Sequence, residues 1–256
     1  MQRFIDHGIL LLAVLVFCGP VAWILAAAFD PATVTENWRD LTRTLSREAT
    51  GPGLDRMIFV SFALALGVSV LTTVISFLAA FAATCFDRPF LGLCFWVTLS
   101  TLYFPIEARM LQTLDVVAAL GLTSSFGGLL LPVLQLALGT LFFRQHLKRL
   151  PVELLEAARL DAAGPIRCLW EIVLPLSRPA LATVALVACV IGWNQYLWPL
   201  MASVDDRHWT LVRGLQWVST GSGAGLLLAA LSLLPPLTVI VLFRRALVLR
   251  YQPDLK

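Results

Sequence analysis

The sequence predicts an all-α integral membrane protein with six transmembrane helices and a helical hairpin on its inner side. Of its 256 residues, 59% are apolar and 14% are charged, against about 25% charged residues in an ordinary soluble domain. Six apolar stretches are long enough to cross about 30 Å of hydrocarbon at about 1.5 Å per helical residue. They cover residues 8–29, 57–83, 90–110, 126–143, 174–200 and 224–243.

Each stretch is expected to be a helix, because lipid offers no hydrogen-bond partner to open backbone groups. The runs are also too long and too continuously apolar for barrel strands. The first run, of about 22 residues, exceeds the core of a secretory signal, so we interpret it as a retained span. Several runs contain proline, and kinks are expected where neighbouring groups can bond the freed carbonyls. These prolines are Pro20, Pro105, Pro132, Pro235 and Pro236.

The basic residues between the spans predict that both chain ends lie in the cytoplasm. With this orientation, twelve of the 19 Lys and Arg residues fall on the cytoplasmic side, where membrane proteins usually carry the excess. Residues 30–56 then form a polar external loop, and the longest internal loop covers about residues 144–178. We expect residues 1–256 to form a single transmembrane domain.

The internal loop predicts two short helices rather than an irregular connection. Pro151 suits a first helical position, and Glu153 and Glu156 follow in the opening turns, where the helix dipole favours acidic groups. Gly164 and Pro165 then interrupt the chain. Apolar side chains at helical spacing form one face of the second helix: Ile166, Leu169, Trp170 and Val173. Such a hairpin indicates a binding partner on the inner side.

The sequence shows no catalytic or nucleotide-binding constellation. Neither Lys148 nor Lys256 follows a glycine, as the lysine of a P-loop does, so ATP hydrolysis would have to reside on another polypeptide. The motifs HExxH, GxSxG and GxGxxG do not occur, and the three histidines lie far apart. The five cysteines lack metal-site spacing, and a net charge of +3 does not suggest nucleic acid. We expect a non-catalytic chain that binds no metal.

One internal motif resembles the EAA loop of binding-protein-dependent ABC importer permeases. It reads Glu-Ala-Ala-Arg-Leu-Asp over residues 156–161, continues with Gly164 and Pro165, and ends in Ile-Val-Leu-Pro-Leu over residues 172–176. The resemblance extends over essentially the whole chain and implies a multi-pass protein of the bacterial plasma (inner) membrane. One position departs from the family, because Ala162 stands where glycine usually follows the motif Asp. Gly164 would then have to supply any positive φ in the turn.

Three further segments resemble the carbohydrate-importer branch of this family, and within it the permeases for sn-glycerol 3-phosphate. They are Phe-Pro-Ile-Glu-Ala-Arg at 104–109, Leu-Phe-Phe-Arg-Gln at 141–145 and Gly-Trp-Asn-Gln-Tyr-Leu-Trp-Pro-Leu at 192–200. The resemblance implies import of sn-glycerol 3-phosphate or related glycerophosphodiesters, with a neutral sugar or polyol as the alternative. A secondary transporter is a more distant alternative, because the internal repeat typical of that class is not visible.

The resemblance also implies partners and a coupling site. A second homologous permease would complete the pathway, two ABC ATPase subunits would hold ATP and Mg²⁺, and an extracytoplasmic binding protein would deliver substrate. The hairpin would sit in a cleft of the ATPase and act as a lever. The expected coupling residues are Glu156, Ala157, Ala158, Leu160, Asp161 and Gly164. The alternative is a hairpin lying on lipid headgroups, which the acidic residues of this loop disfavour.

Polar and aromatic residues near the spans form a candidate substrate pathway, because ionisable and amide groups in lipid usually face a cavity or a neighbouring helix. It comprises Glu107, Arg109, Trp193, Asn194, Gln195, Tyr196 and Trp198. Arg109 could bind an anionic phosphate, or it could snorkel to the interface or pair with the second permease. Asn194 and Gln195 suit polyol hydroxyls, with interhelical hydrogen bonding as the alternative. The aromatic residues could equally form an interfacial belt.

Overall fold

The computed structural model describes residues 2–47, 53–86, 88–151, 153, 156, 164–218 and 221–248. Within these ranges the chain forms helices and turns and no strand, which confirms the all-α prediction. The helices are α1 (Gln2–Ala28), α2 (Val34–Arg47), α3 (Leu54–Cys85), α4 (Pro89–Ser100), η1 (Thr101–Tyr103), α5 (Ile106–Ala119), α6 (Phe126–Leu130), η2 (Leu131–Val133), α7 (Leu136–Leu147), α9 (Pro165–Cys168), η3 (Leu169–Val173), α10 (Leu174–Trp193), α11 (Leu197–Ala202), η4 (Asp206–His208), α12 (Leu211–Gly214) and α13 (Gly223–Val248). Among the described residues, four helical runs are long and apolar enough to span a membrane, and two bent pairs raise the candidates to six.

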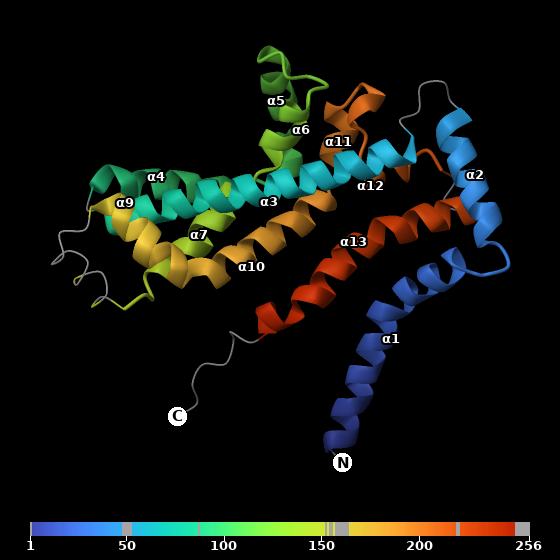
Figure 1. The fold of residues 1–256 in the computed structure, drawn as a ribbon, viewed down its shortest axis with the longest axis horizontal. Coiled ribbons are helices and arrows are strands. Elements are labelled where there is room, and N and C mark those ends of the chain that lie inside the picture. Colours follow the sequence, from blue (N-terminus) through green and yellow to red (C-terminus); the bar gives the residue numbers. More distant parts are fainter. Residues whose placement is uncertain are drawn as a thin grey trace.

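Helix α3 is the central element of the molecule (Figure 1). Its 32 residues make a rod of about 48 Å, and it packs along α10 and α7. The approach to α7 is close, because a Cβ atom at Gly139 would lie 2.6 Å from Ser76 Oγ. The approach to α10 is similar, because a Cβ atom at Gly192 would lie 2.9 Å from Val68 Cβ. Small residues therefore let these three backbones meet in lipid, where burial of apolar side chains gives little driving force.

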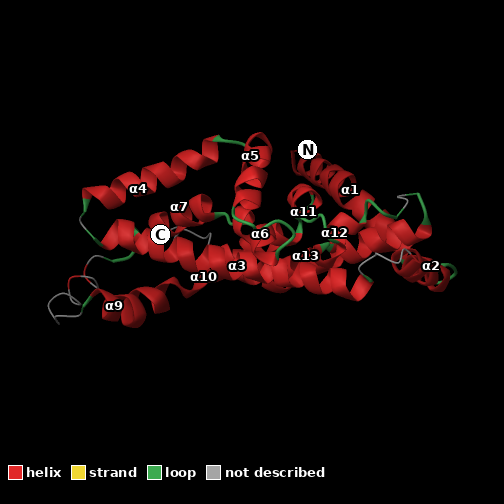
Figure 2. Cartoon of the chain, turned by 90° about the horizontal axis from the view of Figure 1, so that it is seen from above, coloured by secondary structure: helices red, strands yellow, loops and turns green. Residues whose placement is uncertain are grey.

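Three apolar clusters follow one another along α3. The first surrounds Met57, the second surrounds Leu64 and Val68, and the third surrounds Phe77. In the third cluster, the rings of Phe77 and Phe143 meet edge to face at 5.2 Å between centroids. Figure 2 shows α7 lying between α4 and α10, in agreement with the contacts of these helices. The core of the molecule is thus built around α3, α7 and α10.

The predicted span 90–110 is not one continuous helix. Helix α4 and its short extension η1 end before Phe104, and the following helix segment turns away by 117°. The cause is Pro105, which forces the residue before it out of the helical region. Phe104 accordingly has φ −95° and ψ 113°. Glu107 and Arg109 therefore lie in α5, beyond the break, and not at the end of the preceding helix.

The predicted span 126–143 bends by 46° between η2 and α7. Pro132 lies in η2, and the chain leaves helical geometry at Leu134 and Gln135 before α7 begins. The bend confirms the kink expected near this proline, because proline cannot donate the hydrogen bond that would continue the helix.

The predicted span 174–200 is wrong at both ends. The helical run begins at Pro165 and stops at Trp193, so the expected second hairpin helix is continuous with α10. The run stops because Pro199 has no amide hydrogen to donate to the carbonyl of residue 195. The chain then starts a new helix, α11, whose first turn accommodates the proline. On the predicted apolar face, Val173 is buried, whereas Ile166 and Trp170 are exposed.

The predicted external loop 30–56 contains a helix. Helix α2 is amphipathic and packs on α13, with Leu41 and Leu45 buried. Helix α1 also contacts α13, but its membrane-length segment is otherwise exposed and carries many uncovered apolar side chains. Such a surface suits lipid or another membrane-embedded chain rather than water.

We predict that Gly139→Ala or Gly192→Ala lowers the free energy of unfolding by about 1–3 kcal/mol through overpacking against α3. The matched control is Gly92→Ala in α4, because a Cβ atom there has no neighbour within 4 Å. The control should be neutral or slightly stabilising, since alanine has the higher helix propensity. Thermal unfolding in detergent measures the difference. Equal stability of the three variants would show that these glycines do not control helix approach.

Candidate functional site

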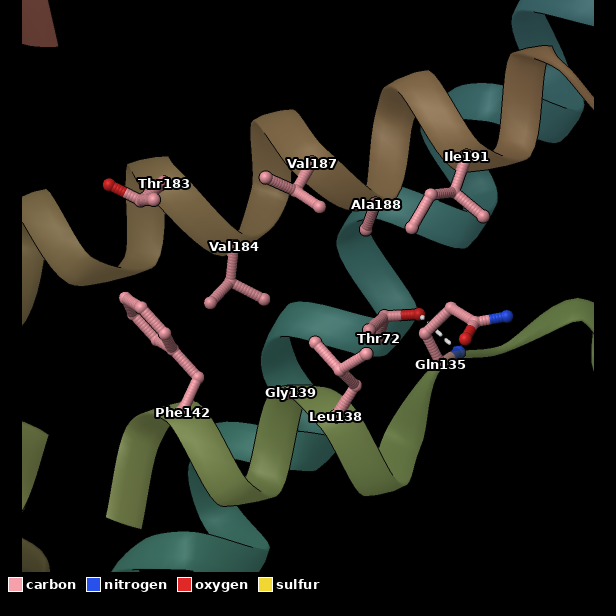
Figure 3. Close-up of a pocket in the computed structure, with 10 residues that line it drawn as sticks. All are labelled: Thr72, Gln135, Leu138, Gly139, Phe142, Thr183, Val184, Val187, Ala188 and Ile191. Carbon is pink, nitrogen blue, oxygen red and sulfur yellow. Dashed lines mark hydrogen bonds between the residues drawn. The ribbon is translucent and has the colours of Figure 1, made fainter. Parts of the chain in front are cut away.

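Two recesses lie in the part of the chain around α3, α7 and α10, and they share one lining residue. The first, which we call the groove, has a volume of about 80 Å³ and is enclosed by these three helices (Figure 3). Its walls are mostly apolar, and its polar lining residues are Thr72, Gln135 and Thr183. The groove is large enough for a few atoms of a solute but offers few hydrogen-bonding groups.

The second recess, which we call the Arg109 recess, brings three of the predicted pathway residues together. Arg109 of α5, Gln195 and Trp198 line it with groups from the break between η2 and α7. Gln135 lines both this recess and the groove. The Arg109 recess holds about 20 Å³, which is room for about one water molecule. A polyol phosphate would therefore require it to widen.

Arg109 is the charged group of this recess. Its side chain is exposed, and it forms no ion pair with any carboxylate of the described residues. An unpaired guanidinium offers a planar fork of N–H donors that matches a phosphate group. Glu107 lies in the first turn of α5, but its side chain falls outside the described residues.

The two predicted amides end helix α10 instead of lying within it. Asn194 Nδ2 donates to the Val190 carbonyl at 3.0 Å, and Gln195 Nε2 donates to the Ile191 carbonyl at 3.1 Å. These carbonyls belong to the last turn of the helix, and the Val190 carbonyl also accepts the backbone N–H of Asn194 at 3.1 Å. Asn194 is exposed outside the recess, whereas Gln195 is half-buried within it. Of the two amides, Gln195 is the one that lines the Arg109 recess.

Two predicted aromatic residues bond carbonyls that prolines free in neighbouring helices. A proline at position i removes the hydrogen bond to the carbonyl of residue i−4. Pro132 thus frees the Gly128 carbonyl, and Trp198 Nε1 donates to that oxygen at 3.2 Å. Pro236 frees the Ser232 carbonyl, and Trp193 Nε1 donates to it at 2.9 Å. At Pro132 this confirms that the kink occurs where a neighbouring group can satisfy the freed carbonyl, whereas α13 continues as one helix through Pro235 and Pro236.

Of the predicted aromatic residues, Trp198 lines the Arg109 recess, whereas Trp193 and Tyr196 do not. Trp193 and Trp198 are each 4% exposed, so most of each indole is packed inside the chain. Trp193 also meets Phe62 edge to face at 4.9 Å and does not line the Arg109 recess. Tyr196 is more exposed and does not line it either. Trp198 borders the recess while holding α11 against α6.

The coupling-loop residues are described only in part. Glu153 and Glu156 are helical and exposed, and Gly164 precedes α9. Gly164 has φ −63° and ψ 164°, so it does not supply the positive φ that the shifted glycine was expected to provide. The remaining predicted coupling residues lie outside the described residues: Ala157, Ala158, Leu160 and Asp161.

Sequence reasoning missed Gln135 and Arg213. Gln135 carried a usable signal, because it is an amide inside the apolar stretch 126–143. Arg213 is 7% exposed, its Nη1 donates to the Ser203 carbonyl and hydroxyl at 2.6 Å, and its guanidinium lies over the Trp209 ring at 4.2 Å. Burial lowers the pKa of Arg213 from a high ordinary value, and its contacts hold the loop before α13 together.

Comparison with known proteins identifies the family of this chain. Residues 2–252 match the family model described as binding-protein-dependent transport system inner membrane component. The chain belongs to this family. It is therefore a permease subunit of a binding-protein-dependent importer, as the EAA-like motif predicted.

Several relatives of this permease carry the name sn-glycerol-3-phosphate transport system permease protein UgpE. The Brucella suis protein is 33% identical over 96% of this chain and 94% of its own length. The Rhizobium meliloti protein is 34% identical over the same shares of each chain. The Yersinia enterocolitica protein is 41% identical over 74% of this chain and 69% of its own.

A solved structure supports the fold of the permease. It is a crystal structure of a bacterial ABC transporter involved in the import of the acidic polysaccharide alginate. The matched chain has a TM-score of 0.76 and 19% sequence identity, with 95% of each chain covered. This likeness concerns the fold. Within the described residues of the permease, no three His, Cys, Asp or Glu side chains form a group that could hold a metal ion.

We predict that Trp193→Phe and Trp198→Phe each lower the free energy of unfolding by about 1–3 kcal/mol, because each leaves a buried carbonyl without its donor. The control is Trp96→Phe in α4, since the Trp96 side chain is exposed. Thermal unfolding of the purified permease measures the effect. Stabilities equal to that of the control would contradict the role of the indole N–H groups.

Proposed function

We propose that this permease forms half of the translocation pathway for sn-glycerol 3-phosphate or related glycerophosphodiesters. The observation that carries the proposal is the Arg109 recess, where a guanidinium that pairs with none of the described carboxylates lines the same recess as the amide of Gln195. The name shared by relatives 33–41% identical to the permease supports the same substrate.

The two groups suit the two parts of such a substrate. The Arg109 guanidinium binds a phosphate through charge-assisted hydrogen bonds, which are stronger than neutral ones. The Gln195 carboxamide binds a hydroxyl group of the glycerol portion. The small volume of the recess indicates that the substrate enters after the surrounding helices move apart.

We propose that the remaining machinery resides on partner chains. A second homologous permease completes the pathway, two ABC ATPase subunits hydrolyse ATP with Mg²⁺, and an extracytoplasmic binding protein delivers the substrate. The permease itself is non-catalytic and binds no cofactor, and both its ends lie in the cytoplasm. Glu156 makes the polar contact to the ATPase, and Ala157, Ala158, Leu160, Asp161 and Gly164 complete the coupling loop. The exposure of Glu156 supports this contact.

The complete importer in proteoliposomes tests the substrate assignment. We expect ATP-dependent uptake of radiolabelled sn-glycerol 3-phosphate that unlabelled glycerophosphodiesters reduce by competition. Neutral glycerol and a neutral disaccharide should not compete. Uptake of a neutral polyol or sugar, without uptake of the phosphate, would replace the proposal by the neutral-substrate alternative.

We predict that Arg109→Gln raises the KM for sn-glycerol 3-phosphate uptake by about tenfold or more and leaves basal ATP hydrolysis unchanged. The reason is the loss of a charged hydrogen bond worth about 1.5–3 kcal/mol. Arg39→Gln is the matched control, because Arg39 is an exposed arginine of α2 outside both recesses. Unchanged substrate-stimulated turnover in the Arg109 variant would remove Arg109 from the pathway.

We predict that Glu156→Lys leaves membrane insertion intact, abolishes uptake and weakens association with the ATPase, because it places a cation where the ATPase receives an anion. Glu153→Lys is the control, since Glu153 is also helical and exposed but lies outside the motif. Uptake and co-purification of the ATPase with the permease measure the two effects. Normal uptake by the Glu156 variant would refute its coupling role.

A further inference from the structure

Gln135 occupies an irregular piece of backbone near the middle of the membrane-spanning core. It separates η2 from α7, and its backbone has φ −90° and ψ 51°, outside helical geometry. Its amide nitrogen donates to Thr72 Oγ1 at 3.3 Å, and Thr72 lies close to the middle of α3. Non-helical backbone at membrane depth is tolerated where it is buried in protein or lines a cavity. Gln135 does the latter, because it lines both the Arg109 recess and the groove.

The side chain of Gln135 keeps hydrogen-bonding capacity for a ligand. Its Nε2 atom donates to the Val133 carbonyl two residues earlier, at 3.2 Å. A carboxamide carries two N–H donors and an oxygen that accepts two hydrogen bonds, so this single contact leaves most of the group available. In Figure 3, the carboxamide points away from Phe142, which lies at the other end of the groove.

The other polar side chains of the groove are engaged with backbone groups. Thr183 Oγ1 donates to the Pro179 carbonyl at 2.9 Å, and Thr72 Oγ1 accepts the Gln135 amide hydrogen. The remaining groove residues are apolar or glycine. A hydrated solute that passes from the Arg109 recess into the groove would therefore lose its hydrogen bonds to water. Among the described groove residues it would find one carboxamide, with several free donor and acceptor sites, and two threonine hydroxyls with less remaining capacity.

We propose that Gln135 is a specificity-determining residue that binds a hydroxyl group of the polyol phosphate between the Arg109 recess and the groove. The inference rests on the proposed function, because it takes the substrate to be a phosphorylated polyol. Arg109 binds the phosphate group, and the Gln135 carboxamide forms a hydrogen bond with a hydroxyl group of the same substrate. Apolar pockets discriminate weakly between a hydroxylated ligand and its deoxy form, whereas a group placed to bond the hydroxyl discriminates strongly.

The test compares substrates that differ by one hydroxyl group. Uptake by the complete importer in proteoliposomes gives kcat/KM for sn-glycerol 3-phosphate, 3-hydroxypropyl phosphate and 2-hydroxypropyl phosphate. The ratio of the parent to each deoxy analogue is measured for the unaltered permease and for Gln135→Met, which keeps the chain length and removes the amide. Because the same binding protein serves both permeases, its own preference cancels when the two ratios are compared.

In the Gln135→Met variant, we expect the kcat/KM ratio of the parent to at least one analogue to fall about three- to tenfold. This is the effect of losing one neutral hydrogen bond. Gln112→Met is the matched control, because Gln112 is exposed on α5 outside both recesses. Its two ratios should equal those of the unaltered permease. If both ratios also stay unchanged in Gln135→Met, the inference is wrong, even where that variant transports all three compounds more slowly.

A second variant covers the case in which Gln135→Met fails to assemble. Gln135→Glu keeps an acceptor oxygen and the side-chain length but adds a negative charge near the phosphate. We expect it to retain the hydroxyl preference while lowering kcat/KM for all three anionic compounds at least tenfold. Undiminished uptake would overturn the placement of Gln135 beside the substrate. Absence of sn-glycerol 3-phosphate uptake by the unaltered permease would instead refute the proposed function, so the two failures are distinguishable.

Discussion

A backbone carbonyl that loses its helical partner inside a membrane has no water to replace it, and this constraint organises the permease. Pro132 and Pro236 each free one carbonyl, and in both cases an indole N–H from another helix bonds the exposed oxygen. Trp198 thereby joins α11 to α6, and Trp193 joins α10 to α13. The first carbonyl lies beside a helix break and the second lies within the continuous helix α13, and in both places a specific donor fixes the packing of two helices.

The same breaks create the candidate site. Pro105 turns α5 away from α4, the bend after Pro132 places Gln135 at a helix break, and the end of α10 before Pro199 leaves Gln195 in the same recess as Arg109. Uninterrupted helices would have placed these polar groups at different depths and on different faces. Small residues on α7 and α10 bring both helices against α3, and these three helices line the groove.

The helical run Pro165–Trp193 connects the proposed coupling loop to the candidate site. Its 29 residues make a rod of about 43 Å, which begins at Pro165 within the EAA-like motif and ends two residues before Gln195. In the proposed function the coupling loop contacts the ATPase, so a movement of that loop would shift this rod along α3. The small recess around Arg109 is the place where such a shift would change the space available to substrate.

The sequence by itself determined the all-helical membrane class, the importer family and most positions where proline bends a helix, because composition, a local motif and proline geometry are properties of short segments. It also identified Arg109, Gln195 and Trp198 as candidates. Only the tertiary structure decided that these three residues share a recess, that Trp193 and Asn194 lie elsewhere, and that residues 30–56 include a packed helix. Those outcomes depend on which helices are neighbours and on which side chain reaches a freed carbonyl. The hydrophobic periodicity of one segment does not predict its contacts with distant segments.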